Sequence, residues 1–85
     1  EQPELVQGLY LPAFNQLIKI LKDKKATGYE YTEDDISKLT DAYNQVGYYY
    51  ILKEDYPKAI EYFKNTLVVN PTDETAQQMV DALKG

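Results

Sequence analysis

Apolar residues recur at intervals of three and four, and this spacing constrains the fold more than any other feature of the sequence. Because an α-helix has about 3.6 residues per turn, such residues form one buried stripe. We expect a first helix over residues 4–23, although Gly8 and Pro12 weaken its first half and allow either a kink or a start near Leu11. The stripe of this helix consists of Leu5, Val6, Leu9, Tyr10, Ala13, Phe14, Leu17, Ile18 and Leu21.

Capping and stop signals mark a second and a third helix. Thr32 can cap a helix start, and three acidic residues follow it where the helix dipole favours negative charge. We expect this second helix to span residues 33–53. Asp55 is a further cap, and Pro57 falls in a first turn, where proline is tolerated. These signals predict a third helix over residues 56–69.

A fourth helix is predicted at the end of the chain. Asn70-Pro71 stops the preceding helix, Thr72 is the expected cap, and the helix should span residues 73–84. The sequence therefore predicts an all-α fold of antiparallel helix pairs in a single domain, residues 1–85. Because the sequence opens on Glu1 and not on methionine, the chain is either a processed mature protein or a piece of a longer one. We expect the C-terminal part of a longer protein.

Composition disfavours several classes of function. The chain contains no histidine and no cysteine, so it lacks the side chains that most often serve as general bases or thiol nucleophiles near neutral pH. Its acidic groups at residues 33–35 and 73–74 begin helices and lack the spacing of a calcium loop. We therefore expect no enzymatic activity, no cofactor and no metal site.

Charge and hydropathy narrow the choice of partners. A net charge of −5 opposes binding to nucleic acid, which depends on Lys and Arg neutralising phosphates. The one basic cluster falls near the C-terminal end of the first predicted helix, where the negative end of the helix dipole stabilises cations. It comprises Lys19, Lys22, Lys24 and Lys25. No apolar run approaches the roughly 18 residues of a membrane span. We expect a soluble protein without membrane insertion, and the sequence does not distinguish cytoplasm from periplasm.

The second and third predicted helices share a more specific pattern. Its landmarks, in chain order, are Tyr43, Val46, Gly47, Tyr50, Ala59, Phe63 and Pro71. In order and spacing they resemble the tetratricopeptide repeat (TPR), a helix-turn-helix unit of about 34 residues. The resemblance covers residues 40–73. Tryptophan is frequent in the family where Tyr43 stands, leucine where Val46 stands, and alanine where Thr66 stands.

This resemblance implies a short right-handed superhelix of stacked helix pairs. Residues 4–23 would be the second helix of a preceding, degenerate unit, and residues 73–84 a closing helix. Physical reasoning gives the landmarks their roles: Gly47, without a side chain, lets the partner helix approach at the small Ala59, and Phe63 fills the space between units. Tyr50 is expected in the core.

TPR arrays hold peptides in a concave groove lined by the first helix of each pair, so the resemblance implies a protein-interaction scaffold that binds a protein or peptide segment. The groove residues would be Asp41, Asn44, Tyr48, Ile51 and Leu52. Tyr48 is the expected anchor, because tyrosine offers a large contact area at low entropy cost. In a short array, the same residues could instead pack on neighbouring helices.

The alternative is a structural role. The chain would then be the end cap of a solenoid or a self-associating unit, forming a homo-oligomer, with no foreign peptide ligand. At least three repeats are usually needed to close a continuous core, and this favours such contacts. The sequence identifies neither the partner nor the number of repeats in the whole protein.

Overall fold

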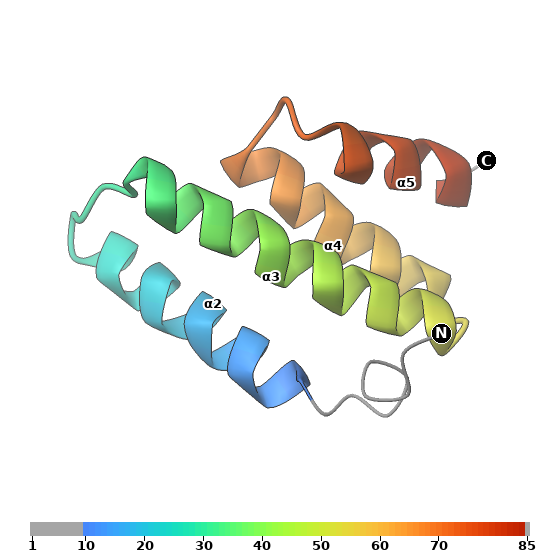
Figure 1. Ribbon diagram of the computed structural model, residues 1–85, viewed down its shortest axis with the longest axis horizontal. Coiled ribbons are helices and arrows are strands. Elements are labelled where there is room, and N and C mark those ends of the chain that lie inside the picture. Colours follow the sequence, from blue (N-terminus) through green and yellow to red (C-terminus); the bar gives the residue numbers. More distant parts are fainter. Residues whose placement is uncertain (1–9, 85) are drawn as a thin grey trace.

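The computed structural model describes residues 10–84, which form four α-helices and no strand. The helices are α2 (Leu11–Ala26), α3 (Glu33–Leu52), α4 (Tyr56–Val69) and α5 (Glu74–Lys84), each antiparallel to the next along the chain (Figure 1). The predicted all-α class is confirmed. The part of the first predicted helix that falls on residues 4–9 lies outside the described residues.

The boundaries of α2 follow from its end residues. It begins at Leu11, so Pro12 lies in the first turn, where its missing N–H costs no helical hydrogen bond. The helix continues to Ala26, three residues beyond the predicted end, and Lys24 and Lys25 occupy its last turn next to the negative end of the dipole. Gly28 then turns the chain at a φ of 97°, a conformation that favours glycine.

Side-chain caps begin α3 and α4 as predicted. The Thr32 hydroxyl accepts a hydrogen bond from the Asp35 N–H at 3.1 Å, and the Asp35 carboxylate accepts one from the Thr32 N–H at 3.0 Å. The Tyr29 hydroxyl also donates to this carboxylate, and these bonds hold the pKa of Asp35 below its ordinary value. At the start of α4, the Asp55 carboxylate accepts from the Lys58 N–H at 3.3 Å.

The cap of α5 differs from the prediction. Asp73, not Thr72, accepts the hydrogen bond from the Ala76 N–H, at 2.9 Å, so Asp73 precedes the helix that was expected to include it. The Thr72 hydroxyl donates instead to the Asn70 side-chain oxygen at 3.2 Å. A capping side chain commonly accepts a hydrogen bond from the N–H three positions later in the chain. Asp73 is the residue three positions before Ala76.

The helices pack in chain order: α2 on α3, α3 on α4, and α4 on α5 (Figure 1). One buried cluster joins α2 to α3 through Ile18, Leu21, Leu39, Ala42 and Tyr43. A second joins α4 to α5 through Ala59, Phe63, Ala76 and Val80, with Tyr48 and Ile51 of α3 packed against it. Such serial packing is typical of helical repeat arrays, in which each unit contacts only its neighbours.

The contact between α3 and α4 depends on Gly47. A Cβ atom added there would lie 2.7 Å from Cε2 and 2.8 Å from Cζ of the Phe63 ring. Phe63 and Ala59 are both fully buried, so the ring is enclosed on its other sides. The sequence predicted a close helix approach at Gly47, and the structure shows that the Phe63 ring occupies the space of the missing side chain.

We expect Gly47→Ala to destabilise the protein. Overpacking a core costs about 1–3 kcal/mol, whereas alanine recovers only about 1 kcal/mol over glycine in a helix interior. Because Phe63→Leu removes the clashing ring atoms, the double variant should lose less free energy of unfolding than the sum of the two single variants. Urea unfolding of all four proteins measures both effects. A Gly47→Ala protein as stable as the wild type would show that the ring has room to move.

Candidate functional site

The five residues predicted to line a groove fall into three environments. Asp41 is exposed, and Leu52 is exposed to 37%. Tyr48 and Ile51 are half-buried and pack against the α4–α5 cluster. Asn44, at 9% exposure, is buried. The predicted set is therefore split between the surface and the interior.

Asn44 belongs to an internal hydrogen-bond network that joins three helices. The Thr66 hydroxyl donates to its side-chain oxygen at 2.8 Å, and its amide nitrogen donates to the Asp73 carboxylate at 3.1 Å. The same carboxylate oxygen caps α5 at Ala76. With its oxygen and its amide both engaged inside the fold, Asn44 is not placed to contact a ligand, and its expected role in a groove is corrected.

A second polar contact supports the same end of the molecule. The Asn70 amide donates to the Thr40 hydroxyl at 3.3 Å, and Thr40 donates to the Ile36 carbonyl at 2.8 Å. Asn70 was predicted only to end a helix. Together with the Asn44 network, this contact fixes the turn between α4 and α5 against α3.

Tyr48 and Ile51 form an apolar surface with Met79 and Leu83 of α5, which the sequence analysis did not place at a site. All four pack from outside against the cluster of Ala59, Phe63, Ala76 and Val80. The Tyr48 ring meets the Phe63 ring edge to face, with centroids 5.5 Å apart. Met79 and Leu83 are four residues apart on one side of α5, a spacing that could have indicated this surface.

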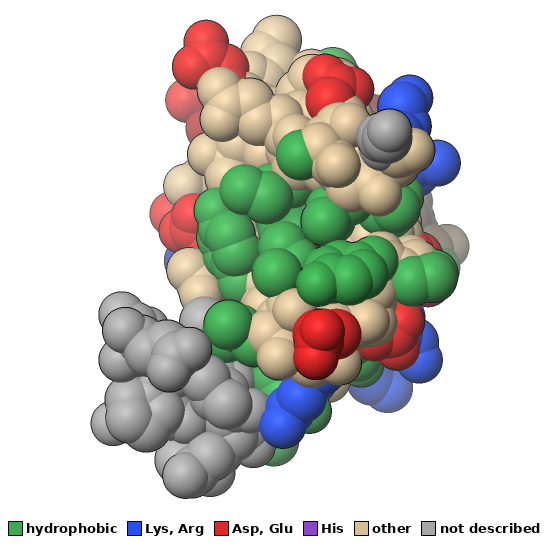
Figure 2. Space-filling model, turned by 90° about the vertical axis from the view of Figure 1, so that its right-hand side faces the viewer, with side chains coloured by type: hydrophobic (Ala, Val, Ile, Leu, Met, Phe, Trp, Pro, Cys, Tyr) green, Lys and Arg blue, Asp and Glu red, His purple; other side chains and the backbone are tan. Residues whose placement is uncertain are grey.

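Leu52 extends this surface, because it follows Tyr48 by one helical turn on the same side of α3. We call Tyr48, Ile51, Leu52, Met79 and Leu83 the α3–α5 face. The C-terminal ends of both helices lie at one end of the molecule (Figure 1). Figure 2 faces that end and shows hydrophobic side chains gathered in one patch, with acidic side chains at its edges.

The three consecutive tyrosines separate as helical geometry requires. Tyr48 contacts Phe63, whereas the Tyr50 ring stacks on Tyr62 at a centroid distance of 5.6 Å. Tyr49 meets the edge of Tyr50 at 5.0 Å. Tyr50, which was expected in the core, is half-buried and packs against the cluster that contains Ala59 and Phe63. No common aromatic platform results.

The other repeat landmarks are packing residues, apart from one. Tyr43, Val46, Gly47, Ala59 and Phe63 are all buried. Pro71 is exposed in the turn before α5. Thr66 is fully buried, and its hydroxyl donates the hydrogen bond that the Asn44 side-chain oxygen accepts.

Within residues 10–84, no group of three or more Asp or Glu side chains is arranged to hold a metal ion. None of the helices in this part of the chain is both long enough and apolar enough to cross a membrane.

The Asn44 network predicts a specific loss of stability. Thr66→Val keeps the shape of the side chain but leaves the buried Asn44 oxygen without its donor, which costs about 1–3 kcal/mol. Thr66→Ser is the matched control, because it keeps the hydroxyl and loses only a methyl group. We expect urea unfolding to show the larger loss for Thr66→Val. A larger loss for Thr66→Ser would mean that the methyl group, and not the hydrogen bond, stabilises this position.

Comparison with known proteins adds no relative to this description. No protein-family model, no curated protein and no solved structure matches the chain.

Proposed function

We propose that the chain is a TPR-like protein-interaction scaffold that binds a partner segment on the α3–α5 face. The observation that carries this proposal is a set of partly buried apolar side chains that two helices, α3 and α5, contribute around one buried cluster. A surface of this kind, centred on an aromatic anchor, suits the apolar side of a peptide or helix. The order of the repeat landmarks along α3 and α4 supports the same proposal.

The charges around the face indicate the chemistry of the partner. Asp41 of α3 is exposed and lies seven residues before Tyr48 on the same side of the helix, and the chain carries a net charge of −5. A segment that combines apolar residues with Lys or Arg would contact the face and its acidic edge together. Electrostatic attraction of this kind mainly speeds association and selects among partners.

The second candidate is self-association as a structural end cap. Serial packing leaves a terminal helix with one main neighbour, and among the described helices the main neighbour of α5 is α4. In a repeat array, such a helix either carries a polar outer face or meets another unit. If the face joins two copies of this chain, the melting temperature should rise with protein concentration.

A capture experiment tests the peptide-binding proposal. The wild type, Tyr48→Ala/Leu52→Ala and the control Ile20→Ala serve as bait in a native extract, after circular dichroism shows that all three are folded. Ile20 is a suitable control because it lies on α2 and is exposed to 45%, similar to Leu52. Retained proteins are identified by mass spectrometry, and their affinities are then measured by calorimetry.

We expect a partner that the wild type and Ile20→Ala retain and the double variant loses, with affinity reduced at least about tenfold, as for removal of an interface anchor. A partner held equally by all three baits would contradict the assignment of the face. The end cap would be favoured if no partner is retained and the melting temperature of the wild type rises with protein concentration, whereas that of the double variant does not.

A further inference from the structure

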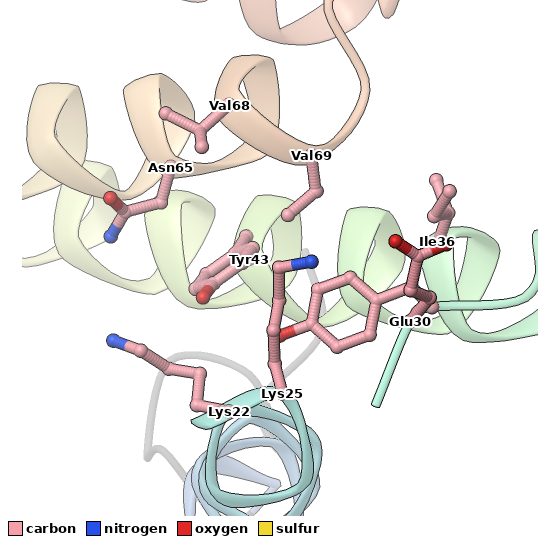
Figure 3. Close-up of a pocket in the computed structure, with 9 residues that line it drawn as sticks. Lys22, Lys25, Glu30, Ile36, Tyr43, Asn65, Val68 and Val69 are labelled. Carbon is pink, nitrogen blue, oxygen red and sulfur yellow. The ribbon is translucent and has the colours of Figure 1, made fainter. Parts of the chain in front are cut away.

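A cavity of about 530 Å³ lies between α2 and α4 on the side of α3 (Figure 3). It falls within the size range of small-molecule sites. Ile36 of α3 and Val69 of α4 give it apolar walls. It shares no lining residue with the α3–α5 face, so it is a separate feature of the molecule.

Tyr43 contributes a hydroxyl group to this cavity. The side chain is only 5% exposed, and it packs in the α2–α3 cluster. Figure 3 shows its hydroxyl end directed into the cavity. The hydroxyl makes no hydrogen bond to any other residue among residues 10–84, and it is not sealed from solvent. Burial, followed by the neighbouring Tyr31 and Tyr62, raises the pKa of Tyr43, so the group is a neutral donor at pH 7.

Two further polar groups face the same part of the cavity. The Lys22 ammonium of α2 and the Asn65 amide of α4 end on the same side of the Tyr43 hydroxyl, to its left in Figure 3. Within residues 10–84 the ion pairs are Lys19 with Asp23 and Lys38 with Asp34, so Lys22 has no carboxylate partner there. A cation and two neutral donors from three different elements thus converge on one space.

The charges of the cavity favour a monoanion. The Lys25 ammonium nitrogen lies 4.9 Å from the centre of the Tyr31 ring. It is on the other side of the cavity from the Lys22 ammonium. Glu30 adds a negative charge on that side. Lys22, Lys25 and Glu30 together give the lining of the cavity a net charge of +1, which suits a carboxylate better than a doubly charged phosphate.

We propose that this cavity binds a small monocarboxylate with a compact apolar body. The carboxylate accepts hydrogen bonds from Lys22, the Tyr43 hydroxyl and the Asn65 amide, and the apolar body packs on Val69. The same chemistry is offered by a free organic acid and by an apolar residue at the C-terminus of a polypeptide. In both cases the ligand differs from the apolar, basic segment proposed for the α3–α5 face.

An NMR titration tests this assignment. N-acetyl-leucine and its uncharged analogue N-acetyl-leucinamide are added separately to the ¹⁵N-labelled protein at pH 7, and amide resonances are followed. We expect saturable shifts around Tyr43, Asn65 and Val69 with N-acetyl-leucine, at a dissociation constant of low millimolar order for a fragment of this size. Equal shifts with the amide, or none up to roughly 50 mM acid, would overturn the proposal.

Two variants and a matched control locate the site. Lys22→Gln should weaken binding of N-acetyl-leucine roughly tenfold, because it removes the positive charge that faces the carboxylate, and Tyr43→Phe should weaken it severalfold, because it removes one hydrogen-bond donor. Tyr62→Phe removes a hydroxyl from a neighbouring tyrosine that does not line the cavity, and it should leave the affinity unchanged. Unaltered binding by both Lys22→Gln and Tyr43→Phe would overturn the assignment.

Two longer probes distinguish the source of the carboxylate. One is an N-acetylated Gly-Gly-Gly-Leu peptide with a free C-terminus, and the other is octanoate. Binding of the peptide at least as tight as that of N-acetyl-leucine would support a polypeptide C-terminus as the ligand. Binding of octanoate with exclusion of the peptide would support a free organic acid.

Discussion

The contact between Gly47 and the Phe63 ring determines how closely α3 and α4 approach, and the rest of the structure is built on this pair of helices. The ring occupies the volume that any side chain at position 47 would need, and it is fully buried beside Ala59. On its outer side the same ring supports Tyr48. One glycine therefore sets both the core and the position of the exposed aromatic residue next to it.

A polar network performs the corresponding task between α3 and α5, which share few direct contacts. Asn44 accepts from Thr66 and donates to Asp73, while Asp73 caps the first turn of α5. Buried polar groups are costly unless they are paired, so this arrangement specifies one orientation of α5 more sharply than apolar packing alone would. The position of Met79 and Leu83 relative to Tyr48 depends on that orientation.

Local signals predicted the helices well, because caps and stops act within a few residues. Thr32 and Asp55 cap the helices that the sequence indicated, and the spacing of apolar residues identified the buried positions Tyr43, Val46, Ala59 and Phe63. The choice of Asp73 over Thr72 was missed because two adjacent residues can both cap a helix. That choice is made by tertiary contact, since Asn44 also binds Asp73.

The candidate sites were less predictable, because they depend on residues far apart in the sequence. Asn44 has the helical position of a groove residue, but its partners Thr66 and Asp73 lie 22 and 29 residues away and place it inside the fold. The cavity beside Tyr43 likewise requires Lys22 of α2 and Asn65 of α4 to line one space with Tyr43 of α3. Periodicity identifies the buried side of a helix, and it does not identify which neighbours that side meets.

The account predicts an α3–α5 face that is open in the isolated chain and available to a partner. Paramagnetic relaxation by a neutral, freely diffusing gadolinium chelate measures this exposure directly at the methyl groups of leucine and methionine. The methyl groups of Leu52, Met79 and Leu83 should be broadened far more than those of the fully buried Leu39. Protection of these methyl groups equal to that of Leu39 would show that the face is already covered, and it would contradict the proposed function.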